Sequence, residues 1–252
     1  MGELVDLTDK IKKYYKFSIH EVRGFVIAIL IIAFIISFRE WGGASFDLST
    51  GLFNLFNAVL IVALSILIHD AGQRIWGLAI GFRIEYKMWT FGLIGALILA
   101  FLSNGRLWLI VPGGFLLHHM AGHRLGYFRY GLNIMGQAMV ALAGPLFTFM
   151  LIILLKVLNE FTPSLLLEKA ILFNVIYLIT SMLPIPPLDG SKIYYGSRMA
   201  YAFVLPALVA ATILMIVDIP IFFSLVLSLL IGVVLWLIYY VSFENKVWTG
   251  PK

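Results

Sequence analysis

The stretch NLFNAVLIVALSILIHDAGQRIWGL, residues 54–78, decides what kind of fold this chain can have. It is mostly apolar and long enough for a helix that crosses the hydrocarbon core of a bilayer, which takes about 20 residues. The run His69-Asp70-Ala71-Gly72-Gln73 interrupts it near its end. Ionisable side chains are costly inside a membrane, so such a run marks a candidate functional site. The stretch therefore predicts a membrane-spanning helix with a polar site close to one end.

The remaining sequence also has the composition of a membrane protein. Of the 252 residues, 62% are hydrophobic and 12% are charged, whereas soluble domains are about half apolar and about a quarter charged. This excludes a disordered chain, a nucleic-acid binder with a basic surface and an ordinary soluble enzyme. We therefore expect membrane lipid, and no nucleic acid, among its partners. The absence of cysteine excludes disulfides and thiolate metal ligands.

Six apolar stretches are candidates for membrane spans: residues 20–38, 54–78, 137–158, 169–184, 199–218 and 219–241. We therefore expect an all-α, multi-pass membrane protein with about six helices, built as a single domain over residues 1–252. Residues 1–19 are charged and have apolar residues at helical spacing, which predicts an amphipathic N-terminal segment at the membrane surface. Residues 79–136 are rich in glycine and aromatic residues, and we expect a re-entrant or small β insertion there.

The basic residues indicate whether the insertion crosses the membrane. If it does not cross and the N-terminus is cytoplasmic, only Arg39, Lys156 and Lys169 of the 18 Lys and Arg residues lie outside, with Arg74 within a span. If residues 90–111 cross, this asymmetry largely disappears after the second span. The positive-inside rule therefore favours a non-crossing insertion and a cytoplasmic N-terminus. We expect the protein in the plasma membrane of a prokaryote.

Two polar motifs could form one site. His69 and Gln73 are four residues apart and share a helix face, with Asp70 beside them. In the motif H-E-x-x-H two histidines at this spacing bind zinc and the glutamate acts as general base. The second motif is LPIPPLDG, residues 183–190, where prolines end a helix and predict irregular backbone around Asp189. With six spans, both motifs lie on the cytoplasmic side.

Together these motifs resemble the site-2 protease family of intramembrane zinc metalloproteases. The resemblance rests on HDAGQ (69–73), LAGPL (142–146) and LPIPPLDGSK (183–192), and the flanking FSIHEVR (17–23), EYKMW (85–89) and VPG (111–113) look like an archaeal branch of that family. It covers roughly residues 17–200 and implies the site-2 protease core fold. It also implies a zinc ion whose bound water attacks a peptide bond inside the membrane.

Carried over position by position, the resemblance implies His69, Gln73 and Asp189 as metal ligands and Asp70 as the catalytic base. Two of these positions depart from the family, because Asp70 replaces the glutamate and Gln73 replaces the second histidine. A hydrolytic zinc normally has three protein ligands and a water, and an amide is a weak ligand compared with imidazole. The metal motif of this chain is therefore degenerate.

Two further positions depart from the resemblance. Family members usually carry asparagines after A-G-P and before the L-P of the aspartate motif, where this chain has Thr148 and Thr180 or Ser181. Those amides are thought to hold the substrate backbone. Several changes in one site favour a catalytically impaired homologue, a pseudo-protease that binds transmembrane segments of membrane proteins.

Three other interpretations stay open. The first is an active zinc-dependent intramembrane metalloendopeptidase with a variant His/Gln/Asp site. The second is a non-proteolytic transporter or metal-handling protein that reuses the pocket. In the third, His69, Asp70, Gln73 and Asp189 form a metal-free hydrogen-bond network that keeps the pocket packed.

Three further histidines, His118, His119 and His123, lie in the insertion. Gly122 nearby favours a solvated loop at the membrane interface. The alternative is a replacement source of metal ligands or a pH- or metal-responsive gate, because histidine titrates near neutral pH.

Overall fold

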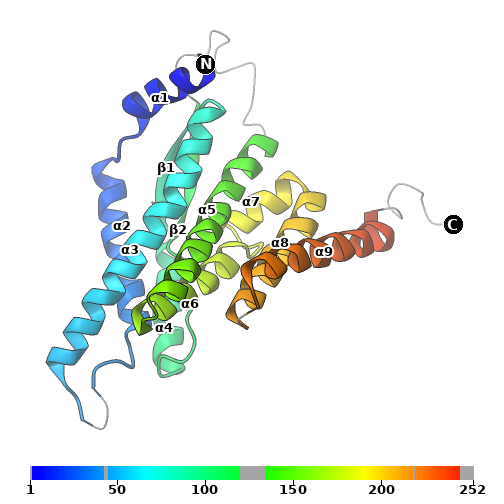
Figure 1. Ribbon diagram of the computed structural model, residues 1–252. Helices are drawn as coiled ribbons and strands as arrows, with labels where there is room; N and C mark the ends of the chain where they lie inside the picture. The colour runs from blue at the N-terminus through cyan, green and yellow to red at the C-terminus, as the bar shows by residue number, and fades with distance from the viewer. Residues whose placement is uncertain (1, 43–44, 120–133, 218, 245–252) are drawn as a thin grey trace.

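A computed structural model describes residues 2–42, 45–119, 134–217 and 219–244 of the protein, as a bundle of helices with a two-stranded sheet (Figure 1). Its elements in chain order are α1 (Gly2–Tyr14), α2 (Ile19–Ile36), α3 (Leu48–Ala79), β1 (Phe82–Met88), α4 (Thr90–Leu102), β2 (Gly113–His119), α5 (Ile134–Phe161), α6 (Leu165–Ser181), α7 (Asp189–Gly196), α8 (Arg198–Ile216), α9 (Ile221–Tyr239) and the π-helix η1 (Tyr240–Glu244). Helices α2, α3, α5 and α6 surround the site described below, and α8 and α9 pack together beside them.

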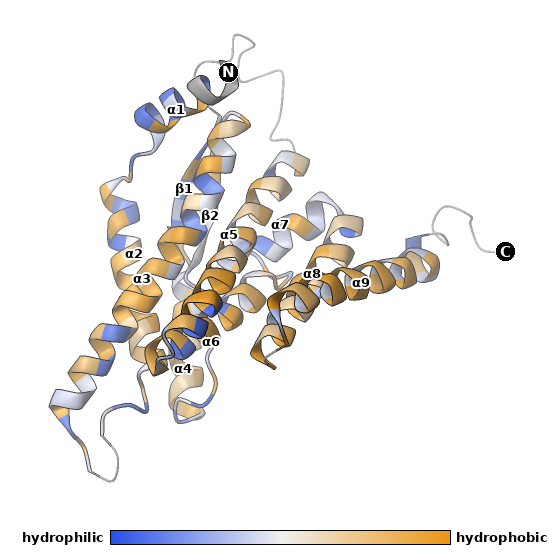
Figure 2. Cartoon of the chain, viewed as in Figure 1, coloured by the Kyte–Doolittle hydropathy of each residue, from blue (hydrophilic) through white to orange (hydrophobic). Residues whose placement is uncertain are grey.

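Five helices in the described residues are long and apolar enough to cross a membrane: α2, α3, α5, α8 and α9 with η1. Figure 2 shows the apolar residues that cover these helices. A multi-pass membrane protein is therefore the right class. The predicted span 169–184 corresponds to α6, whose 17 residues measure about 26 Å, less than the ~30 Å hydrocarbon core. The count of six spans stays a prediction.

Local sequence signals fix where several helices begin and end. At the start of α2, the Ser18 hydroxyl accepts a hydrogen bond from Glu21 N, and the Glu21 carboxylate accepts one from Ser18 N at 2.7 Å. This is the reciprocal capping box expected from a serine three residues before a glutamate. The last apolar stretch is divided into α8 and α9, with Pro220 at the N-cap of α9.

The insertion after α3 contains the predicted β structure together with a helix. Strands β1 and β2 are antiparallel, with Phe82 opposite His119 and Met88 opposite Gly113. The chain therefore leaves and returns at the same end of the sheet. Between the strands, α4 has 13 residues and measures about 20 Å, so it is too short to cross a bilayer alone.

The insertion nevertheless reaches the far end of the bundle. The rings of Phe101 and Phe38 are 5.0 Å apart, at the ends of α4 and α2. Gly105 has φ +69°, and a methyl group added to it would lie 2.9 Å from Arg39 Cγ. Arg106 lines the same cavity as Arg39. The prediction that Arg106 lies on the same side of the membrane as the N-terminus was therefore wrong. Strand β1 and helix α4 together are long enough to carry the chain to the end of the bundle where α2 ends.

Candidate functional site

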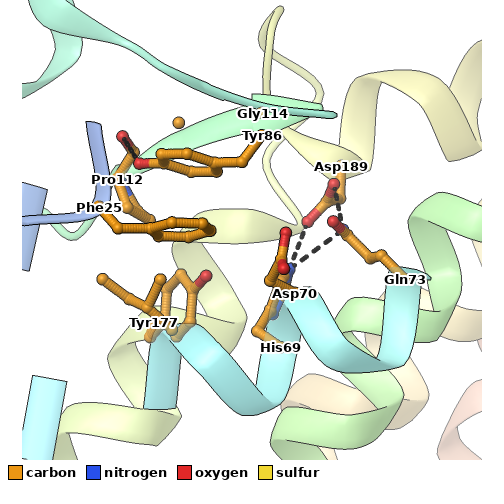
Figure 3. Close-up of a pocket in the computed structure, with 11 residues that line it drawn as sticks. Phe25, His69, Asp70, Gln73, Tyr86, Pro112, Gly114, Tyr177 and Asp189 are labelled. Atoms are coloured by element: carbon orange, nitrogen blue, oxygen red, sulfur yellow. Dashed lines mark hydrogen bonds and ion pairs between the residues drawn. The ribbon is translucent and has the colours of Figure 1, made fainter. Parts of the chain in front are cut away.

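The structure brings the two polar motifs into direct contact. His69 Nε2 lies 2.8 Å from Asp189 Oδ2, and the Gln73 amide donates to Asp189 Oδ1 at 2.9 Å (Figure 3). All three side chains are buried. Helix α3 supplies His69 and Gln73 from one face, because they are one helical turn apart. Residues more than a hundred positions apart in sequence thus share one hydrogen-bond network.

Asp189 does not lie in irregular backbone, as the prolines had suggested, because it is the first residue of the short helix α7. The preceding turn ends α6, and Leu188 forms the N-cap of α7. Lys192 on the same helix donates to Pro187 O at 3.0 Å and lies over the Phe115 ring. Burial lowers the pKa of Lys192, and the nearby Asp189 carboxylate partly offsets this effect.

Helix α5 approaches the network through the glycine of the LAGPL motif. A methyl group added at Gly144 would lie 2.3 Å from His69 Nε2 and 2.6 Å from the Gln73 amide nitrogen. Such distances are far below van der Waals contact, so only glycine lets the α5 backbone come this close. The motif therefore has a local packing role in this protein, because it closes one side of the site.

Thr148, one turn further along α5, fixes the orientation of the His69 ring. Its hydroxyl oxygen lies 2.9 Å from His69 Nδ1, and the side chain is fully buried. When the neutral ring donates through Nε2 to Asp189, Nδ1 is an acceptor and the Thr148 hydroxyl is its donor. The sequence singled out Thr148 only as a departure from an asparagine and did not predict this contact.

We expect Thr148→Val to destabilise the protein by about 1–3 kcal/mol, because it leaves the buried Nδ1 of His69 without a partner. Thr212→Val is the matched control. Thr212 is also fully buried, but its hydroxyl bonds to carbonyl groups of its own helix. Unfolding in detergent measures both variants, and the ¹⁵N shifts of the imidazole report the tautomer. Equal losses of stability with unchanged ¹⁵N shifts would contradict the assigned role.

The other two positions that depart from the family pattern, Thr180 and Ser181, do not line the small cavity beside His69 that is described below. Thr180 donates its hydroxyl to Ile110 O at 2.7 Å, which ties α6 to the segment before β2. Ser181 donates to Leu178 O within its own helix. Thr180 and Ser181 therefore serve packing and helix ends, and neither lines the cavity beside His69.

Asp70, the predicted catalytic base, is engaged in an ion pair. Its carboxylate accepts a hydrogen bond from Arg74 Nε at 2.5 Å, and the Arg74 guanidinium also pairs with Glu21. The three side chains are at most 5% exposed. Arg74 Nη1 donates to Ile84 O at 3.2 Å. The Arg74 guanidinium thus bonds to two carboxylates and to the backbone of β1.

Glu21 extends this ion-pair cluster to the sheet. Its carboxylate accepts a hydrogen bond from Tyr86 N at 2.8 Å as well as the Arg74 contact. The cluster Glu21–Arg74–Asp70 therefore joins α2, α3 and β1. The sequence did not predict it, although a charged residue four positions after Asp70 within a span was the available signal.

The cavity beside the network is small. Its volume is about 20 Å³, and Asp70, Tyr86 and Tyr177 are among its lining residues. A water molecule needs about 10–15 Å³, so the cavity has room for about one. The Tyr86 hydroxyl donates to Pro112 O at 2.7 Å. Burial and the charge of Asp70 both raise the pKa of Tyr86, so its phenol stays protonated.

The donor set does not fit a hydrolytic zinc as it stands. Within the described residues, no group of three or more His, Asp or Glu side chains could hold a metal ion. The predicted ligands comprise one imidazole, one carboxylate and one amide. Two atoms bound tetrahedrally to zinc with bonds of about 2.0 Å lie about 3.3 Å apart, whereas His69 Nε2 and Asp189 Oδ2 are at hydrogen-bond distance, 2.8 Å.

The histidines of the insertion do not join this site. His118 and His119 lie in β2 and not in a loop, so the prediction of a loop at these two positions was wrong. Both residues pair with β1, His118 opposite Arg83 and His119 opposite Phe82, so the strand continues where the glycine had suggested a loop. His118 Nε2 is 3.0 Å from the Glu85 carboxylate, and both side chains are exposed. His123 lies outside the described residues.

Comparison with known proteins gives one informative relative. The chain is 26% identical over 200 residues to a protein of Methanocaldococcus jannaschii named "Putative zinc metalloprotease", an alignment that covers 75% of this chain and 91% of the relative. This similarity supports a metalloprotease-like family. No family model matches the chain. No solved structure matches it either.

Proposed function

We propose that this protein is a catalytically impaired member of the site-2 protease group that binds transmembrane segments of other membrane proteins. The proposal includes six membrane spans, namely α6 and the five longer helices named above. It also places the protein in the plasma membrane of a prokaryote, with its N-terminus in the cytoplasm. Its partners are membrane lipid and membrane-embedded polypeptide. Nucleic acid is not among them.

The observation that carries the proposal is the direct bonding of His69 Nε2 to Asp189. This ring nitrogen would have to give up its proton and its carboxylate partner before it could bind a metal. Gln73, at the position of the missing ligand, donates to the same carboxylate. Asp70 is held by Arg74 at the position of the base. The polar residues thus satisfy one another without a metal ion.

A segment-binding role is supported by the edge of the sheet. In the described part of the chain, β2 pairs with β1 alone. The other edge of β1 is already occupied, because Ile84 O accepts from Arg74 and Tyr86 N donates to Glu21. The outer edge of β2 can accept an extended segment by strand addition, beside the cavity that Gly114 lines.

Zinc analysis of the purified full-length protein tests the loss of the metal site. We expect well under one zinc per chain in the parent and a clear rise in Gln73→His, because a second imidazole restores the third strong ligand. Adding His69→Ala to that variant should remove the gain. Near-stoichiometric zinc in the parent that His69→Ala and Asp189→Ala abolish, with peptide cleavage lost in Asp70→Asn, would overturn the proposal.

Segment binding is tested separately by crosslinking. Because the chain has no cysteine, single-cysteine variants give unambiguous products. We expect Leu116→Cys on β2 to crosslink to a hydrophobic peptide that carries one cysteine. Leu102→Cys, at the far end of α4, is the exposed control and should not. Equal crosslinking at both positions would count against binding at β2.

An active zinc metalloendopeptidase remains the second candidate, and two observations favour it. The relative is named as a zinc metalloprotease. In addition, the buried carboxylates of Glu21, Asp70 and Asp189 outnumber the buried guanidinium of Arg74, so a divalent cation would balance the remaining negative charge. In the pseudo-protease, the nearby Lys192 offsets part of this charge instead. The zinc analysis above separates the two candidates.

A further inference from the structure

A second and larger cavity lies at the opposite end of the bundle from the sheet. Its lining residues come from the end of α2, the loop after α4 and the middle of α6, and its volume is about 680 Å³. This is within the range of ~300–1,000 Å³ that is usual for small-molecule sites. It shares no lining residue with the His69 site, so the function proposed above does not account for it.

Two arginines, Arg39 and Arg106, line this cavity. Glu40, the one acidic residue among its lining residues, pairs with Lys169 at 2.5 Å. Arg39 and Arg106 are both exposed, and within the described residues neither forms an ion pair. The two segments pack together where Gly105 lies against the side chains of Phe38 and Arg39. Among the residues that the structure describes, these two positive charges therefore have no carboxylate partner.

The remaining walls are apolar or aromatic. Ile36 from α2 and Leu172 and Ile176 from α6 form an apolar side, and Trp108 lies on the loop after α4. Ile36 ends the first membrane-spanning helix, so the cavity is at the depth where a lipid head group meets its chains. Tryptophan is enriched at that depth. The site thus offers guanidinium groups beside an apolar wall.

We propose that this cavity binds a phosphate group carried by an anionic amphiphile, with Arg39 and Arg106 on the phosphate and the Ile36–Leu172–Ile176 wall on an acyl chain. Guanidinium groups form paired, charge-assisted hydrogen bonds with phosphate oxygens. Basic pockets between membrane helices on the cytoplasmic side bind phospholipid head groups in this way, and the same chemistry is available to arginines at this end of the bundle. The phosphate can belong to a membrane lipid or be free, and the experiment below distinguishes these sources.

The test uses the purified full-length protein in detergent, titrated with phosphatidylglycerol, with uncharged diacylglycerol or with inorganic phosphate, and read by native mass spectrometry and thermal shift. We expect phosphatidylglycerol to bind at least about tenfold more tightly than diacylglycerol. Arg39→Gln and Arg106→Gln should each weaken it by about tenfold. Arg83→Gln, an exposed arginine on β1 at the other end of the molecule, is the matched control and should not.

The three ligands separate the possible results. Binding of phosphatidylglycerol alone supports the lipid as the source, and binding of both phosphate and phosphatidylglycerol with loss in the arginine variants supports the phosphate group itself. Equal binding of diacylglycerol would overturn the proposal, and so would unchanged binding in both arginine variants. Arg106→Lys keeps the charge without the paired donors and should bind with intermediate strength, which separates phosphate recognition from misfolding.

Discussion

Replacing Gly190 with alanine should destabilise the protein by about 3 kcal/mol or more, at the upper end of what overpacking costs. An added methyl group would lie 2.0 Å from Met182 O and 2.6 Å from Leu183 O. These are backbone atoms at the end of α6, so no side-chain rotation can relieve the clash. Helix α7 would have to move away, and Asp189, its first residue, would lose His69. Denaturant unfolding in detergent micelles measures the loss.

Gly95→Ala is the control for this prediction. Gly95 lies within α4, and a methyl group there meets no atom within 4 Å. Alanine favours a helix over glycine by about 0.5–1 kcal/mol, so this variant should be as stable as the parent or slightly more stable. If Gly190→Ala matched Gly95→Ala in stability, the close approach of α7 to α6 would be wrong.

Replacing Arg74 with methionine should cost about 3–5 kcal/mol, the range found when one partner of a buried ion pair is removed. The change keeps a long side chain but leaves Glu21 and Asp70 buried with no positive charge between them. Arg74→Lys should be intermediate, because one ammonium group cannot bond to both carboxylates and to Ile84 O together. The same unfolding measurement applies.

A triple variant distinguishes charge from packing in this cluster. Glu21→Gln and Asp70→Asn, added to Arg74→Met, remove both uncompensated charges, and buried ion pairs are often replaced by neutral groups at little cost. We therefore expect the triple variant to regain at least half of the stability lost in Arg74→Met. If the triple variant were as unstable as Arg74→Met, the loss of stability would come from packing and not from charge. If Arg74→Met were as stable as the parent, the cluster would have no structural role.

Much of the fold could be predicted because apolar length is a strong signal in a membrane protein. The stretch 54–78 became the greater part of α3, and the capping pattern at Ser18 marked the first residue of α2. The depth of the insertion could not be read in this way. A strand followed by a short helix has no apolar stretch long enough to show how deep it reaches. Nothing in the sequence therefore predicted that Arg106 and Arg39 line the same cavity.

The sequence motifs predicted that His69, Gln73 and Asp189 would lie together, but not how they are bonded to one another, and their role as metal ligands stays a prediction. Helical spacing brings His69 and Gln73 to one face, and the proline break before Asp189 suggested the opposite wall. The hydrogen-bond partner of each polar atom depends on how the helices pack against one another, and spacing along the sequence does not describe that packing. Glu21 on α2 therefore pairs with Arg74, and Thr148 on α5 bonds to His69 Nδ1, although neither pair has a spacing signal in the sequence.

The β1–α4–β2 insertion also constrains the order in which the protein can assemble. The outer edge of β2 has backbone groups that lipid could not satisfy, and α4 is too short to stay in the bilayer as an independent helix. Several of its contacts come from residues made later, since Ile110 O is held by Thr180 and Phe115 lies under Lys192. These contacts of the insertion therefore form only after α6 and α7 have been synthesised, and the polar site is complete when α7 brings Asp189 to His69.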